Sequence, residues 1–168
     1  MTILRGERVL LRPGRPEDTD ALIRIRNEPE VAWRWGFEDI EEEVGEQFIG
    51  VEDGLVIEVG GGVVGAIQYH EEEEPMYRHA GMDIFLSTSH HGKGLGTEAT
   101  RVLARYLIEE RGHHRLTIDP AADNVAAIRT YEKVGFRRVG IMRKYERGTD
   151  GTWHDGLLMD MLAEEFSP

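Results

Sequence analysis

The sequence of 168 residues contains no cysteine, so a disulfide framework and any zinc site built on cysteine are excluded. It has no run of 18 apolar residues, and we expect no helix that spans a membrane. The first twenty residues lack the apolar stretch of a signal peptide. These absences, and a length typical of one domain, predict a single cytoplasmic domain over residues 1–168 without membrane association.

Positive charge is scarce and unevenly distributed. The formal net charge is −12, which argues against general nucleic-acid binding because that requires a basic face. Residues 1–90 carry 8 basic and 20 acidic residues, residues 91–147 carry 12 and 7, and residues 148–168 carry none and 5. The basic segment suggests an anionic ligand and the acidic remainder a cationic one. An acidic surface that maintains solubility explains the same distribution.

Hydrophobic periodicity and breaker residues divide the chain into strands and helices without an internal repeat. The expected strands are 7–13, the two arms of a hairpin within 54–70, 80–87, 114–120, 136–146 and 153–166. The expected helices are 16–27, one that starts near Glu38, 95–112 and 123–136. This order of elements predicts one mixed α/β domain.

Three glycines, Gly92, Gly94 and Gly96, stand between the strand at 80–87 and the helix at 95–112. A glycine inside a helix costs about 1 kcal/mol relative to alanine, so their position at the helix start needs a reason. Free N–H groups and the helix dipole make a helix start attractive to anions, and a phosphate can approach a backbone that has no Cβ. With Lys93 beside them, the glycines predict a pyrophosphate site.

Two other phosphate-binding motifs, the Walker A loop and the dinucleotide fingerprint, also place glycines before a helix. The segment does not match a Walker A loop, because Ser87 stands where that motif has its first glycine and because Lys93 precedes Gly94. A dinucleotide fingerprint matches at Gly94, Gly96 and Ala99, and Asp119 ends the following strand. Only roughly 70 residues follow this match, and they lead into two long strands, so an NAD-dependent oxidoreductase is kept as a remote alternative.

The segments "HHGKGLG", "HRLTIDPAADNVAAIRTYEKVGF" and "DGTWHDGLLMDML" together resemble the GNAT superfamily of N-acetyltransferases over nearly the whole chain. His91 stands where the family's pyrophosphate motif usually has Arg or Gln. The resemblance implies a mostly antiparallel, twisted sheet flanked by helices. It also implies that this sheet is splayed between its fourth and fifth strands, here 80–87 and 114–120, and that acetyl-CoA is the acetyl donor.

The resemblance also implies the cofactor contacts. The main chain of the strand around Ile84 would pair with the pantetheine arm, and Tyr131 would face the sulfur as general acid. The implied cofactor-binding residues are Phe85, Leu86, His91, Gly92, Lys93, Gly94, Leu95, Gly96, Thr97, Asn124 and Tyr131. Tyr131 follows Asn124 by two helical turns, so both can share one helix face. Apart from the resemblance, a core aromatic is the simpler interpretation of Tyr131.

Within the superfamily, "GKGLGTEATRVLARYL" and "TIDPAADNVAAIRTYEKVGF" are similar to the aminoglycoside 6′-N-acetyltransferases. That similarity implies that Asp119 is the base at the acceptor site and that Asp83 and Gln68 contact the antibiotic. The surrounding acidic residues, with Glu38 among them, suit a polycation, and Trp33 and Trp35 could stack on sugar rings. A solvated acidic loop and core tryptophans are the simpler interpretations of these last residues.

Several alternatives stay open at this point. The same motifs occur in acetyltransferases of protein N-termini, such as the ribosomal-protein enzymes, and a non-catalytic acyl-CoA sensor is a remote alternative. The pairs His90-His91 and His113-His114 suggest a metal, but adjacent histidines do not share a face of a strand, so no metal site is expected. Dimers are common in the superfamily, so a homodimer is considered as a partner alongside the small-molecule amine.

Overall fold

The computed structural model describes residues 1–36 and 38–168, and within them the strands form one sheet in the order β1-β2-β3-β4-β5-β6-β8-β7. The strands are β1 (Leu4–Arg5), β2 (Val9–Pro13), β3 (Gly54–Val59), β4 (Gly62–Glu72), β5 (His79–Leu86), β6 (Arg115–Ile118), β7 (Arg137–Arg147) and β8 (Trp153–Leu162). The α-helices are α1 (Thr19–Arg26), α2 (Pro29–Trp35), α3 (Ile40–Phe48), α4 (Leu95–Glu109) and α5 (Val125–Val134). None of these helices is long and apolar enough to cross a membrane.

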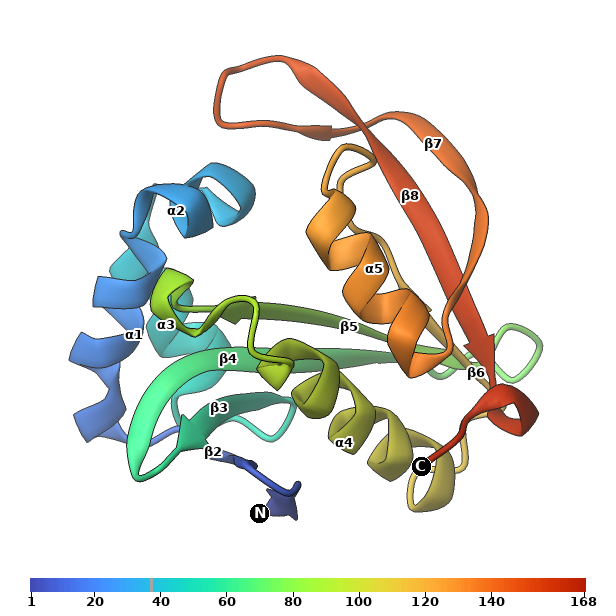
Figure 1. Ribbon diagram of the computed structural model, residues 1–168, viewed down its shortest axis with the longest axis horizontal. Coiled ribbons are helices and arrows are strands. Elements are labelled where there is room, and N and C mark those ends of the chain that lie inside the picture. Colours follow the sequence, from blue (N-terminus) through green and yellow to red (C-terminus); the bar gives the residue numbers. More distant parts are fainter. Residues whose placement is uncertain (37) are drawn as a thin grey trace.

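The sheet is antiparallel at every pairing except that of β5 with β6, which is parallel. Those two strands pair only at Ala80 with Leu116 and at Gly81 with Thr117. Beyond Gly81 they separate, and Figure 1 shows β7, β8 and α5 turning away from β3, β4 and β5. The expected mostly antiparallel sheet, open between the strands at 80–87 and 114–120, is confirmed.

Helices cover both faces of the sheet. Successive residues of a strand point to opposite faces, so apolar neighbours in one strand are buried in different cores. Ala66 of β4 packs with α1 and α3, whereas its neighbour Ile67 packs with α4 and α5. Residues that recur at helical spacing along α4 fill the core between the sheet and helices α4 and α5. All of them are buried: Leu95, Ala99, Val102, Leu103, Tyr106 and Leu107. The helix predicted from this apolar stripe is confirmed, although it ends at Glu109 rather than Gly112.

The N-terminal third contains two elements that the sequence pattern did not predict. The short strand β1 pairs with β2, and helix α2 holds both Trp33 and Trp35. Helix α2 begins with Pro29, whose fixed φ and missing N–H suit a first helical position. Its two turns contain one valine and two tryptophans, which are weak helix formers, so tertiary packing of Val31 and Ala32 stabilises it.

Candidate active site

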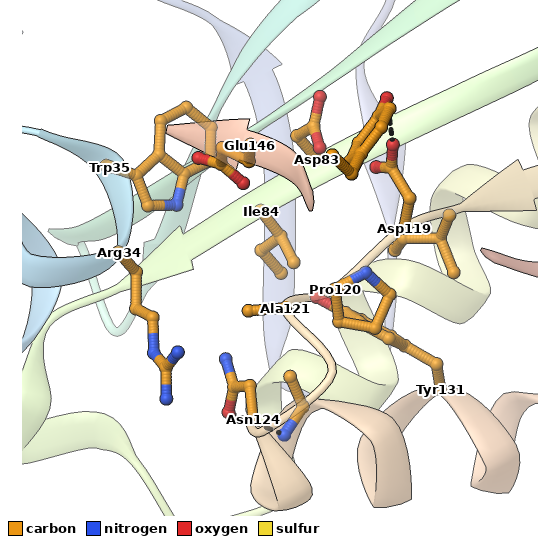
Figure 2. A pocket seen from close by; sticks show the side chains of 13 residues that line it. Arg34, Trp35, Asp83, Ile84, Asp119, Pro120, Ala121, Asn124, Tyr131 and Glu146 are labelled. Atoms are coloured by element: carbon orange, nitrogen blue, oxygen red, sulfur yellow. Dashed lines mark hydrogen bonds between the residues drawn. The ribbon is translucent and has the colours of Figure 1, made fainter. Parts of the chain in front are cut away.

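A cavity of about 550 Å³ lies where β5 and β6 separate (Figure 2). Its walls come from α2, β5, the end of β6, the segment between β6 and α5, α5 itself and β7. The lining residues are Arg34, Trp35, Asp83, Ile84, Ile118, Asp119, Pro120, Ala121, Asn124, Ala127, Tyr131, Tyr145 and Glu146. Segments far apart in the sequence therefore meet at the opening that the short β5–β6 pairing creates.

Two aspartates face the cavity from the two strands that separate. Asp83 lies on β5 opposite Gln68 of β4, and Asp119 follows directly after the last residue of β6. Burial raises the pKa of Asp83, and the negative charge of Asp119 raises it further. A positively charged ligand between the two carboxylates would relieve this repulsion, so the pair favours a cation.

Tyr131 reaches the same cavity from α5 and is buried. Its ring meets Phe136 edge to face, with the centroids 6.4 Å apart. Burial, followed by the charges of Asp83 and Asp119, raises the pKa of Tyr131 well above its ordinary value. The hydroxyl is therefore protonated throughout the neutral range and can supply a proton or a hydrogen bond.

Asn124 caps the start of α5 and also lines the cavity. Its side-chain oxygen accepts the N–H of Ala127 at 3.3 Å, a bond that satisfies one of the free donors of the helix start. The side-chain NH₂ group is then the part of Asn124 that can serve a ligand. Asn124 and Tyr131 line one cavity from the same helix, in agreement with their two-turn spacing.

The glycine-rich turn connects β5 to α4 and is exposed from His91 to Gly94. Gly92 and Gly94 have φ angles of 71° and 79°, a left-handed conformation that side chains disfavour. Gly94 is the N-cap of α4 and provides no side-chain acceptor, so N–H groups of the first turn are free to meet a ligand. Arg8 holds the turn in place, because its Nη1 donates to the carbonyl of Lys93 at 2.7 Å.

Gly96 shows that room exists beside the first turn of α4. A Cβ built there would contact only Leu86 at 3.4 Å and Thr130 at 3.7 Å among the described residues. His91, next to the turn, has its Nε2 2.9 Å from the carbonyl oxygen of Leu86 and is thereby tied to the end of β5. An exposed glycine turn, a helix start and, among the described residues, a strand edge that no neighbouring strand pairs with beyond Gly81 are features that suit a phosphorylated, extended cofactor.

The side chain of Phe85 lies away from the cavity. It is buried between Trp35 and Phe48, at ring-centroid distances of 5.0 and 5.6 Å. The side chain of Phe85 is therefore not available to a cofactor. On the cavity side, Ile84 lines the wall.

The expected acceptor-site residues divide into two groups. Trp35, Asp83 and Asp119 line the cavity. Trp33 is 48% exposed and Glu38 is exposed, and neither lines it. Gln68 is the cross-strand neighbour of Asp83 on β4 and is not among the lining residues.

Three polar or charged lining residues were not predicted as site residues from the sequence: Arg34, Tyr145 and Glu146. Arg34 lies in the last turn of α2, a helix that was not predicted. It pairs at 2.7 Å with Asp123, which belongs to the segment between β6 and α5. Burial raises the pKa of Glu146, with smaller contributions from Asp119 and Asp83. The described lining thus holds three carboxylates and one guanidinium.

Residues 8–137 match the family described as "Acetyltransferase (GNAT) domain". The chain belongs to the GNAT acetyltransferase family. GNAT acetyltransferases use acetyl-CoA, and the turn, the strand edge and Asn124 described above fit that molecule.

Individual relatives are similar over part or all of the chain. An "Aminoglycoside N(6')-acetyltransferase type 1" of Klebsiella pneumoniae is 41% identical over 73 residues, which cover 43% of this chain and 35% of the relative. The chain spans less than half the length of this and other curated relatives that it matches.

Solved structures show the same fold. A GNAT-family acetyltransferase from Bacillus anthracis has a TM-score of 0.86 at 23% identity, covering 98% of this chain and all of that one. The structure of AAC(6')-Ib in complex with "Parmomycin and AcetylCoA" has a TM-score of 0.73 at 27% identity, covering 95% and 96% of the two chains.

Proposed function

We propose that the protein transfers the acetyl group of acetyl-CoA to a primary amine of a polycation, the 6′-amine of an aminoglycoside antibiotic. The observation that carries this proposal is the meeting of Asp83, Asp119 and the protonated Tyr131 in one cavity at the opening between β5 and β6. The similarity to aminoglycoside acetyltransferases supports the same acceptor.

The charge of the cavity supports a polycationic acceptor. Asp83, Asp119 and Glu146 lie on its wall, and Arg34 is already paired with Asp123. Mutual repulsion contributes to the raised pKa of Asp83 and of Glu146. Several ammonium groups bound here would neutralise carboxylates that otherwise repel one another. A single neutral acceptor would gain nothing from this arrangement.

The cofactor would be held by the exposed turn and by the main chain of β5. The residues proposed for this role are Phe85, Leu86, His91, Gly92, Lys93, Gly94, Leu95, Gly96, Thr97, Asn124 and Tyr131. When bound, acetyl-CoA supplies an acetyl group activated as a thioester. The free N–H groups at the start of α4 suit its pyrophosphate.

Two protein groups would manage the protons of the transfer. Asp119 accepts the proton that the attacking amine loses, and Tyr131 supplies the proton that the departing thiolate gains. The amine nitrogen forms a bond to the carbonyl carbon as the carbon–sulfur bond breaks, so the products are an amide and a thiol. Return of the proton from Asp119 to Tyr131 through solvent restores both groups, and no covalent enzyme intermediate is needed.

Trp35 would form the wall against a sugar ring, because it is fixed by Phe85 and by the guanidinium of Arg26 at 5.6 Å. Trp33, Glu38 and Gln68 remain predicted contacts. An aminoglycoside is larger than one ring, and Trp33 and Glu38 would meet only the rings that extend outside the cavity.

The test uses two antibiotics that differ at the reacting position. Neomycin carries an amine at 6′ and paromomycin carries a hydroxyl there. We expect release of free thiol from acetyl-CoA with neomycin and none with paromomycin. Activity with both would contradict acetylation at 6′. Activity only with a peptide that has a ribosomal-protein N-terminus would establish the alternative, a protein N-terminal acetyltransferase.

Asp119 is tested by a pair of variants. We expect Asp119→Asn to lower kcat with neomycin by at least about 100-fold, the usual scale of a catalytic base, while the Kd of neomycin changes much less. Asp20→Asn, at an exposed position of α1 outside the cavity, is the matched control and should retain full activity. Weaker binding with unchanged kcat would show that Asp119 anchors the substrate and is not the base.

A further inference from the structure

The strand β7 is interrupted by a bulge beside the cavity. Met142 pairs with Gly156 and Glu146 pairs with His154, so four steps along β7 correspond to two along β8. Within this bulge Lys144 has a φ angle of 50°, a left-handed conformation that is costly for a residue with a side chain. Bulges redirect side chains, and strained residues persist only where their surroundings hold them.

The bulge brings two consecutive residues to one cavity. In a regular strand, neighbouring side chains point to opposite faces. Here both Tyr145 and Glu146 line the cavity. The backbone irregularity is therefore the reason that Tyr145 is available at this site.

Tyr145 uses its position to bind Asp119. Its hydroxyl donates a hydrogen bond to Oδ2 of Asp119 at 2.7 Å, drawn as the dashed line in Figure 2. This bond, followed by the charge of Asp119, raises the pKa of Tyr145 to about 12. At neutral pH the phenol is protonated and can only donate to the carboxylate, so it occupies one of the two oxygens of Asp119.

Residues 155–157 of β8 contact the segments that carry the two partners of this bond. The N–H of Leu157 donates to the carbonyl of Pro120 at 2.8 Å, and the N–H of Ala122 donates to the carbonyl of Asp155 at 2.9 Å. Residues 155–157 thereby fix the segment that begins at Asp119.

The same segment fixes the bulge. The side chain of Asp155 accepts the N–H of Lys144 at 2.8 Å. A Cβ at position 156 would lie 2.9 Å from Cδ1 of Tyr145, so glycine at this position lets the ring rest on the strand. Tyr145 and Asp119 are thus anchored independently to the same three residues, which sets the distance between them.

We propose that Tyr145 is a positioning residue for the acetyl transfer: its hydroxyl holds one oxygen of Asp119 so that the other oxygen faces the acceptor amine. The assignment rests on the proposed function, in which Asp119 accepts the proton of that amine. It adds a residue of β7, from outside the motifs that identify the family, to the machinery of the reaction.

The first experiment is a double-mutant cycle on kcat with neomycin. Tyr145→Phe removes the hydroxyl and keeps the ring, and we expect kcat to fall about tenfold while the KM of acetyl-CoA is unchanged. In an Asp119→Asn background the same substitution should have no further effect, because the oxygen it positions no longer acts as a base. Tyr77→Phe, at an exposed tyrosine outside the cavity, is the control and should leave kcat unchanged.

Two results of this cycle would overturn the assignment. One is a wild-type kcat in Tyr145→Phe, and the other is an equal loss in the presence and absence of Asp119. In either case Asp119→Asn can still lower kcat by about 100-fold, and the proposed function would stand. If wild-type protein releases no thiol with any amine, the proposed function itself fails.

The second experiment needs no acceptor. Ionisation of the tyrosines is followed by nuclear magnetic resonance of ¹³Cζ-labelled protein, and Tyr145→Phe identifies the resonance. Tyr145 faces Asp119, and the charges of Asp83 and Glu146 also act on it. We expect Asp119→Asn to lower the pKa of Tyr145 from about 12 toward its ordinary value of 10. An unchanged ionisation of Tyr145 would show that the hydrogen bond to Asp119 does not exist in solution.

Discussion

At the scale of single residues, the cavity holds groups that burial places in unusual protonation states. Asp83 has a raised pKa because it is buried near Asp119, and Tyr131 has a strongly raised pKa because it is buried near both. Such groups reduce stability unless a ligand compensates them, and they gather at functional sites for that reason. The residues proposed to contact the substrates are thus also those that the fold holds at a cost.

Tyr131 offers the most direct test at this scale. We expect Tyr131→Phe to lower kcat by about 10²- to 10⁴-fold, the usual contribution of a general acid, and to leave the KM of acetyl-CoA nearly unchanged. Because the pKa of Tyr131 is raised, loss of its proton should not reduce wild-type activity between pH 7 and 9. Steady-state kinetics over that range provides the measurement, and a wild-type kcat in the variant would remove Tyr131 from the mechanism.

Single residues also show where sequence reasoning stops. The glycine-rich turn was predicted from the sequence, because residues without a Cβ suit left-handed φ angles and the close approach of a ligand. Both are local requirements. Trp33 and Trp35 are two residues apart, yet only Trp35 lines the cavity. Which of them does so depends on the packing of α2 against Phe85, and that is not a local property.

At the scale of elements, the turn between β5 and α4 joins a strand edge to a helix start. At Gly96 the requirements of the fold can be told apart from those of a ligand. Its φ angle is not in the left-handed region, and a Cβ built there would meet only ordinary van der Waals contacts among the described residues. Its absence of a side chain is therefore not required by the fold of the free protein.

We expect Gly96→Ala to leave the free energy of unfolding unchanged or to raise it by up to about 1 kcal/mol, since alanine favours a helix. The same change should raise the KM of acetyl-CoA several-fold, since the Cβ would occupy space beside the phosphates. Urea denaturation and initial rates test the two statements separately. A more stable protein with an unchanged KM would show that the cofactor does not approach Gly96.

A second element contact joins the end of β4 to the segment after α4. Glu71 accepts hydrogen bonds from Nη2 of Arg111 and pairs with Nε2 of His113, each at 2.6 Å. The hydrogen bond with Arg111, more than the one with His113, lowers the pKa of Glu71 to about 2. A carboxyl with a depressed pKa stabilises the fold above its unfolded pKa, and this stabilisation is lost as the pH falls toward the folded value.

The expected result for Glu71→Gln is therefore a loss of about 2 kcal/mol of unfolding free energy at pH 7. The difference from wild type should begin to shrink below about pH 4.5, the ordinary pKa of a glutamate, because the carboxyl of the unfolded wild-type chain becomes protonated there while that of the folded protein is still ionised. Denaturation at pH 7 and pH 3.5 measures it, with the exposed Glu73→Gln as control. A difference that stays constant between these pH values would contradict the ionic contribution of Glu71.

At the scale of the whole molecule, charge and topology act together. The acidic segment 1–90 contributes Asp83 and Arg34 to the cavity, and the basic segment 91–147 contributes Asp119 and Glu146 as well as the turn and α4. Among the described residues, the two halves of the sheet pair through two residue pairs between β5 and β6. Carboxylates and a basic segment with a glycine turn are therefore brought to one opening, which would suit a cationic acceptor and an anionic donor.

Salt should act on the two substrates in different ways. Long-range attraction is screened over about 8 Å at physiological ionic strength, so kcat/KM for neomycin should fall about tenfold between 50 and 500 mM NaCl. A monoamine acceptor should show a much weaker dependence. Initial rates at a saturating acetyl-CoA concentration distinguish them, and equal salt dependence would contradict a polycationic acceptor at this acidic cavity.

The sequence by itself determined the mixed α/β class, most element positions and the glycine turn, because these depend on periodicity, propensity and backbone conformation within short segments. Only the tertiary structure decided that Tyr145, Glu146 and Arg34 join Asp83 and Asp119. Tyr145 and Glu146 reach the cavity through a bulge whose bonds to β8 link residues 11 positions apart, and Arg34 meets Asp123 across 89. Such placement follows from how strands pair and separate, and local sequence patterns carry no record of it.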